Sequence, residues 1–107
     1  MIKVKGYIFS RSFFNERVPQ HVQNIVLRDY CKKKKFNFLM SATEYSSKNV
    51  YLILMEMLKN IDKYDGIVFY SLLQLPVDNK ERQKIYKSIL KKKKLLFFAV
   101  EDFRLEK

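Results

Sequence analysis

The chain alternates short apolar runs with longer segments in which apolar residues recur at helical spacing. The short runs are rich in aromatic and β-branched residues, as strands are, and they occupy residues 2–10, 36–42, 66–72 and 95–101. The three segments between them carry apolar residues every three or four positions, as amphipathic helices do. This β-α-β-α-β-α-β order predicts an α/β fold, a three-layer sandwich with a mainly parallel four-stranded sheet of order 2-1-3-4, resolvase-like or flavodoxin-like.

The first and third helical segments have recognisable starts and ends. The first opens at Pro19, and the third opens after Asp78 or Asn79. Each ends in four lysines, at 32–35 and 91–94, and cations are favoured at a helix C-terminus. We interpret these lysines as solvated helix ends on the edge of the sheet that faces away from the usual ligand crevice, with a polyanion site as the alternative.

The second helical segment is apolar almost all round from Val50 to Leu58, and Glu56 is its only charge. A surface helix normally has a polar face. This helix is therefore either deeply buried or covered by another subunit, and we favour a homo-oligomer interface, most simply a dimer, that contains Leu52 and Met55.

Composition limits the classes of partner. The 107 residues, 48% of them hydrophobic, predict one α/β domain spanning 1–107. The formal net charge of +11 would attract polyanions, yet 17 of the 22 basic residues are lysine, whereas arginine is preferred for bidentate recognition of phosphates and bases. We therefore disfavour nucleic acid as a partner.

Several chemistries lack their motifs. With glycine only at 6 and 66, no glycine-rich phosphate loop can be built, so we predict no cofactor. One histidine and the single Cys31 give no metal site and no disulfide. The opening MIKVKGYIFS is short and interrupted by lysine, and no apolar stretch approaches the roughly 18 residues of a membrane span. We expect a cytoplasmic protein.

Polar residues follow every predicted strand, at the edge where parallel strands place their carboxyl ends and α/β folds bind ligands. Such residues are also common at any transition from strand to loop, so the evidence for a site is their convergence. The predicted ligand-binding residues, from these strand ends and from the first helix with the turn before it, are Ser10, Arg11, Ser12, Glu16, Arg17, Asn24, Arg28, Ser41, Thr43, Tyr70, Ser71 and Glu101.

The first helix adds a polar stripe to this edge. His21, Asn24 and Arg28 are spaced i, i+3 and i+7, and Arg17 extends the stripe backward. The stripe starts at a helix N-terminus, where backbone N–H groups favour an anion, and Arg11 and Arg17 could add forked donors.

Acid–base chemistry at this edge would fall to His21 and Glu44. A histidine can donate or accept a proton near neutral pH, with Glu16, Glu44 or Glu101 as its partner. The alternative, an exposed histidine without a function, is about equally compatible with the sequence.

Four segments together resemble the small proteins called the sporadic carbohydrate cluster family: GYIFSRSFFNERVPQHVQNIVLRDYC, SATEYS, DGIVFYSLLQLP and VEDFRL. The resemblance covers nearly the whole chain, and family members are encoded among bacterial surface-carbohydrate biosynthesis genes. It implies a setting in surface-polysaccharide biosynthesis and no particular reaction. Combined with the anion-binding edge predicted above, this setting leads us to expect a protein that binds an acidic or phosphorylated sugar or sugar nucleotide, with or without processing it. The alternatives are a scaffold or regulator that docks a partner through its second helix, and a nucleic-acid-binding domain without strand cleavage.

The opening strand GYIFSRS is also similar, more weakly, to the catalytic domain of serine recombinases. In that family the nucleophilic serine follows the glycine by five residues, a position that is Arg11 here, between Ser10 and Ser12. The family's arginine two residues after the tyrosine is Phe9. The similarity implies a shared fold without strand cleavage.

Overall fold

A computed structural model describes residues 1–10, 18–45 and 51–105 of the chain. Short β-rich runs form strands, and the segments between them form helices, as their patterns predict. The elements in chain order are β1 (Lys3–Phe9), α1 (Gln20–Lys34), β2 (Asn37–Glu44), α2 (Leu52–Lys59), the 3₁₀ turn η1 (Ile61–Lys63), β3 (Gly66–Phe69), the 3₁₀ turn η2 (Leu72–Gln74), α3 (Asn79–Lys91), β4 (Leu95–Phe98) and β5 (Phe103–Leu105).

The strands form one sheet in the order β2-β1-β3-β4-β5. The pairs β1–β2, β1–β3 and β3–β4 are parallel, and β4–β5 is antiparallel. The α/β class and the order 2-1-3-4 are therefore confirmed, but the predicted number of four strands is wrong. The fifth strand has only three residues, with the charged Arg104 in the middle. It is therefore too short to show a periodic hydrophobic pattern in the sequence.

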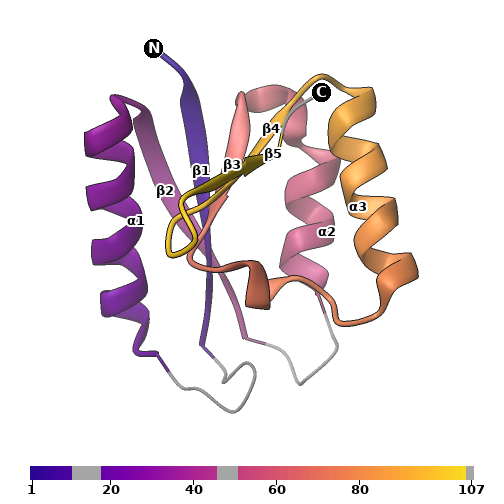
Figure 1. Cartoon of the computed structure of the whole chain (residues 1–107), viewed down its shortest axis with the longest axis horizontal. Coiled ribbons are helices and arrows are strands. Elements are labelled where there is room, and N and C mark those ends of the chain that lie inside the picture. Colours follow the sequence, from indigo (N-terminus) through magenta and orange to yellow (C-terminus); the bar gives the residue numbers. More distant parts are fainter. Residues whose placement is uncertain (11–17, 46–50, 106–107) are drawn as a thin grey trace.

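The helices cover both faces of the sheet (Figure 1). The α1 helix packs on one face, and α2 and α3 pack on the other. The first face buries Leu27, Tyr30 and Cys31 of α1 against Val4, Ile8, Val68 and Phe97. The second buries Leu54, Met57, Ile85 and Ile89 against Tyr7, Phe9, Ile67, Phe69, Leu96 and Phe98.

An irregularity in the β1–β2 register depends on Gly6. The register shifts between Lys5 and Tyr7, on either side of Gly6. A Cβ added to Gly6 would lie 2.5 Å from the Ser41 hydroxyl oxygen and 3.0 Å from the Phe38 ring. Only glycine leaves room for this close contact.

The helix termini agree closely with the predictions. The α1 helix begins at Gln20, one residue after Pro19, and Asp78 caps α3 by accepting a hydrogen bond from the Lys80 N–H at 2.9 Å. The lysine runs lie at the C-terminal ends of α1 and α3. In the first run, Lys34 forms an ion pair with Asp102 at 3.1 Å. The α2 helix buries Leu54 and Met57 against the sheet.

The outer side of α2 exposes apolar side chains beside the charged Glu56 and Lys59. The side chain of Leu52 is 65% exposed and that of Met55 is 38% exposed. Val50 lies outside the described residues. Among the described residues, no helix has both the length and the apolar character that crossing a membrane requires.

Candidate functional site

The carboxyl ends of β1 and β2 are joined through Ser10 and Glu44. The Ser10 N–H and hydroxyl both donate to the main-chain carbonyl of Glu44, at 3.0 and 3.1 Å. Ser10 thereby extends the β1–β2 pairing by one residue and stays partly buried at the edge of the sheet. These two hydrogen bonds hold the ends of β1 and β2 together at this edge of the sheet.

The side chain of Glu44 is completely buried and faces α2. Its Oε1 accepts hydrogen bonds from the Tyr7 hydroxyl at 2.8 Å, the Ile53 N–H at 3.1 Å and the Leu54 N–H at 3.3 Å. Ile53 and Leu54 are in the first turn of α2, whose own N-cap residue, Tyr51, provides no side-chain cap. Glu44 therefore caps α2 from the neighbouring strand.

This placement changes the role predicted for Glu44. An acid or base must reach the substrate, and the Glu44 side chain is enclosed by the helix that it caps. The structure gives Glu44 a structural role at the start of α2, and its acid–base role stays a prediction that this burial disfavours.

A buried glutamine closes the gap between β1 and β3. Gln23 of α1 is completely buried, and its Nε2 donates to the carbonyls of Phe9 and Val18, both at 2.8 Å. Its Oε1 accepts from the Phe9 N–H at 2.9 Å and from Gln74 Nε2 at 3.0 Å. Because β3 pairs with β1 only as far as Tyr7, Gln23 supplies the partners that the last residue of β1 would otherwise lack on that side.

Gln74 links Gln23 to the end of β3. It is also completely buried, and its Oε1 accepts from the Tyr70 N–H at 2.9 Å and the Ser71 N–H at 3.4 Å. Gln23 and Gln74 thus join the ends of β1 and β3 where the connections leave the sheet in opposite directions, the usual ligand position of an open α/β sheet.

Gln23 also fixes both ends of the segment that carries the predicted anion ligands. Phe9 and Val18 flank residues 10–17, and both accept a hydrogen bond from the same amide nitrogen. The segment therefore leaves and rejoins the fold at one point on the edge. Four predicted site residues, Arg11, Ser12, Glu16 and Arg17, lie in it and outside the described residues.

The structure brings Tyr70, Ser71 and Glu101 together at the ends of β3 and β4. The Ser71 hydroxyl donates to Glu101 Oε2 at 2.7 Å, and the Leu72 N–H donates to Glu101 Oε1 at 3.0 Å. The Tyr70 carbonyl accepts from the Val100 N–H at 2.9 Å. Glu101 is exposed, so this cluster combines a fixed carboxylate with access to solvent.

Ser41 and Thr43 lie within β2, not after it as predicted, because the strand continues to Glu44. Ser41 shares a hydrogen bond of 2.5 Å with the Asn24 side chain, which couples β2 to α1. Thr43 is partly buried beside Ile8 in the register. Both side chains are partly exposed on the outer strand of the sheet.

The polar stripe of α1 does not act as one unit. His21 is exposed in the first turn of α1, at the same edge as Ser10, whereas Asn24 turns inward to Ser41. Arg28 is exposed but lies eight residues beyond Gln20, about 12 Å further along the helix axis. Of the stripe residues that the structure describes, His21 alone lies close to the edge.

Sequence reasoning missed the two glutamines. A signal for Gln23 was present, because it shares a helix face with Leu27 and Tyr30, which lie four and seven residues later and are buried. A polar residue at an inward position needs a partner, and the main chain at the end of β1 provides it.

Burial shifts the pKa values of Cys31 and Tyr30. Burial raises the pKa of the Cys31 thiol to about 11, so the thiol stays protonated at neutral pH. Burial, followed by the charge of Asp102, raises the pKa of Tyr30. Within the described parts of the chain, no group of three or more metal-ligating side chains comes together.

Comparisons of the chain with protein-family models, curated proteins and solved structures found no match. The functional argument therefore rests on the residues and on the geometry described above.

Proposed function

We propose that this chain is a cytoplasmic protein of bacterial surface-polysaccharide biosynthesis that binds an acidic or phosphorylated sugar, or a sugar nucleotide, at the C-terminal edge of its sheet. The observation that carries this proposal is the Gln23 clamp. One buried amide holds both ends of the segment 10–17, which contains two arginines, next to the start of α1. A resolvase-like or flavodoxin-like strand order is compatible with a ligand at this edge.

The residue types suit a sugar with a negative charge. Arg11 and Arg17 supply planar donors for a carboxylate or phosphate, and the backbone N–H groups at the start of α1 favour the same charge. Ser12 and Tyr70 supply hydroxyls, and Glu101 accepts hydrogen bonds from sugar hydroxyls in an edge that the glutamine pair keeps rigid.

The ligand binds at this edge, and His21 is the residue there that could transfer a proton. His21 is exposed beside the edge, whereas Glu44 is enclosed, so a proton transfer would have to use His21 with Glu16 or Glu101. His21→Ala should leave ligand affinity within about twofold, while any turnover of the bound sugar should be lost.

A titration with glucose 1-phosphate and a uridine diphosphate sugar acid, followed by amide chemical shifts, tests the proposal. We expect saturable shifts at Ser10, Tyr70 and Glu101. Arg11→Gln with Arg17→Gln should weaken binding about tenfold or more, and Lys91→Gln with Lys87→Gln, an equal charge change on α3, should not. Shifts confined to the lysine-rich helix ends would contradict the proposal.

We also propose that α2 is a self-association surface. Leu52, Met55 and Val77 are 65%, 38% and 63% exposed. They line a continuous groove of two cavities, of about 700 and 380 Å³, that share Met55 and Glu81 and lie between α2 and α3 with the turn before α3. An exposed apolar groove of this kind is typical of an interface.

The charges along the groove suit a second copy of the chain. Asp78 lies at one end of the groove, Lys59, Lys84 and Lys92 lie at the other, and Glu81 lies between them. A two-fold axis across the groove would place the acidic end of one copy over the basic end of the other.

Sedimentation of the wild-type chain and of Leu52→Gln with Met55→Gln tests this interface. The wild type should form dimers and the double variant should be monomeric. Ile25→Gln, which replaces an apolar side chain of 62% exposure on α1, should remain dimeric. A monomeric wild type at high protein concentration would exclude the interface.

A further inference from the structure

Lys5 occupies a position where an α/β sheet normally carries an apolar residue. It lies on β1, which has strands on both sides, and it is level with Leu39 of β2 and Ile67 of β3 in the register. Leu39 and Ile67 both face the core beneath α2, so the Lys5 side chain starts on the same face. A cation at this point loses part of its hydration.

No ion pair or hydrogen bond of the Lys5 side chain is formed with the described residues, although this lysine is only partly exposed. Lys3, two residues earlier on the same strand and face, is exposed by contrast. The difference makes Lys5 a partly buried charge that forms no ion pair with a described residue.

Lys5 lines a cavity of about 300 Å³ between α2, the turn that follows it and the outer half of the sheet. Ala42 of β2 is small enough to leave the cavity open beside Lys5. Lys63 adds a second ammonium group, and Glu56 and Asn60 add a carboxylate and an amide. The two cations exceed the single anion, so the cavity favours a negatively charged occupant.

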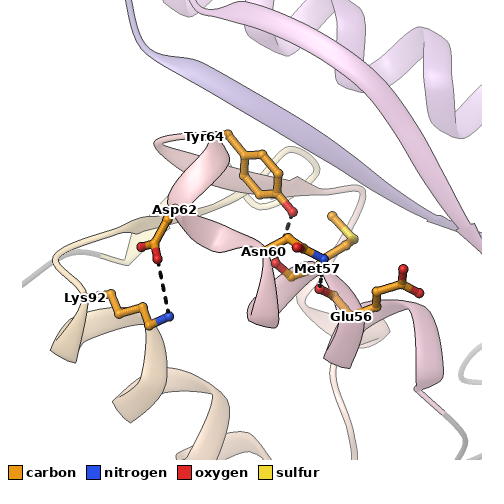
Figure 2. Close-up of polar contacts among 6 residues, drawn as sticks. All are labelled: Glu56, Met57, Asn60, Asp62, Tyr64 and Lys92. Atoms are coloured by element: carbon orange, nitrogen blue, oxygen red, sulfur yellow. Dashed lines mark hydrogen bonds and ion pairs between the residues drawn. The ribbon is translucent and has the colours of Figure 1, made fainter.

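The polar wall of this cavity is held in place by the last turn of α2 (Figure 2). The Tyr64 hydroxyl donates to the Met57 carbonyl at 3.0 Å, and Asn60 Nδ2 donates to the Glu56 carbonyl at 3.0 Å. The Asn60 amide nitrogen is thereby directed at the helix, so its carbonyl oxygen is the atom left to accept from a ligand hydroxyl.

We propose that this cavity is a second binding site, for a small hydroxylated phosphate ester. Lys5 and Lys63 bind the phosphate, and Glu56 and Asn60 accept hydrogen bonds from its hydroxyls. Its volume is at the lower end of the range for ligand pockets, which limits the occupant to about the size of a sugar phosphate. None of Ser10, Tyr70 and Glu101 lines this cavity, so its occupation can be measured separately from that of the C-terminal edge.

The alternative is that Lys5 merely lays its methylene groups along the cavity wall and keeps its ammonium in water. In that case Lys5 should contribute no more to phosphate affinity than an exposed surface lysine does. Two matched variants distinguish a phosphate site from this alternative. Lys5→Met and Lys3→Met each remove one positive charge, from neighbouring positions on the same face of β1.

Amide chemical shifts during titration with inorganic phosphate and with glucose 6-phosphate test the site. We expect saturable shifts at Lys5, Asn60 and Lys63, tighter binding of glucose 6-phosphate than of phosphate, and at least tenfold weaker binding in Lys5→Met but not in Lys3→Met. Ala42→Leu, which fills the cavity and keeps every charge, should also abolish these shifts.

Equal effects of Lys5→Met and Lys3→Met would overturn the proposal, as would the absence of saturable shifts at these three amides at millimolar ligand. Shifts only at Ser10, Tyr70 and Glu101 would place the ligand at the C-terminal edge and would also overturn it. Saturable shifts at Lys5, Asn60 and Lys63 would support this site whether or not the C-terminal edge also binds a ligand.

Discussion

Replacing Glu44 tests the structural role that the fold gives it. Glu44→Gln keeps the shape of the side chain but replaces one acceptor oxygen with an amide that donates. The Glu44 carboxyl group receives the Tyr7 hydroxyl and the first N–H groups of α2, so the substituted amide must turn a donor toward one of these donors.

The expected loss is large for an isosteric change. A hydrogen bond to a charged acceptor contributes about 1.5–3 kcal/mol, and a charge at a helix N-terminus adds up to about 2 kcal/mol when partly buried. These contributions overlap, so we expect Glu44→Gln to lower the free energy of unfolding by about 2–3 kcal/mol. Glu44→Ala, which also leaves a cavity, should lower it by about 3–5 kcal/mol.

Urea unfolding at constant pH, followed by circular dichroism, measures these losses. The exposed ion pair of Asp29 with Lys33 on α1 provides the control, because Asp29→Asn removes the same charge and should change the free energy of unfolding by less than about 0.5 kcal/mol. Tyr7→Phe combined with Glu44→Gln should show a coupling energy of about 0.5–3 kcal/mol. Hydrogen exchange at Ile53 and Leu54 should accelerate in Glu44→Gln.

If Glu44→Gln unfolds within about 0.5 kcal/mol of the wild type and the two amides keep their protection, the cap is not formed. The prediction that Glu44 is an acid–base residue would then regain its support.

Three further changes test other parts of the structure. Gln23→Leu should lower the free energy of unfolding by about 2–4 kcal/mol, since it leaves the main chain of Phe9 without the partners Gln23 provides, whereas the exposed Gln20→Leu should change it by less than about 0.5 kcal/mol; denaturant unfolding measures both. Gly6→Ala should cost about 1–3 kcal/mol, and Ser41→Ala in the same chain should recover part of it, because the added Cβ meets the Ser41 hydroxyl; no recovery would contradict the contact. Cys31 should react slowly with a disulfide reagent at pH 8 in the folded chain and rapidly in urea. Because the folded state keeps a proton that the unfolded state loses at its ordinary pKa of 9.0, the free energy of unfolding should fall as pH rises from 9 to about 11, and a pH-independent free energy in this window would contradict the buried thiol.

The sequence was sufficient for the parts of the fold that follow from periodicity. Local sequence patterns predicted the parallel strands, the helix starts near Pro19 and Asp78, and the lysine-rich helix ends. The structure confirms the positions of all three features. The strand β5 was missed because three residues are too few to show a period, and it is held by its pairing with β4.

The candidate site was predicted less well, because burial of polar groups depends on tertiary packing. Glu44 has the sequence context of a strand-end carboxylate, and only the position of α2 above it turns it into a helix cap. The glutamines act across 51 residues of sequence, so their contact has no local signal. Tyr70, Ser71 and Glu101 were grouped correctly because parallel strands must end at one edge.

The most direct test of the account is a titration of the full chain with the uridine diphosphate sugar acid, read at the amides that frame the Gln23 clamp. We predict saturable shifts at Phe9, Ser10 and Val18, and their loss when Arg11 and Arg17 are both replaced by glutamine. Unchanged shifts in that double variant, or no shift at these three amides at millimolar ligand, would contradict a sugar site at this edge.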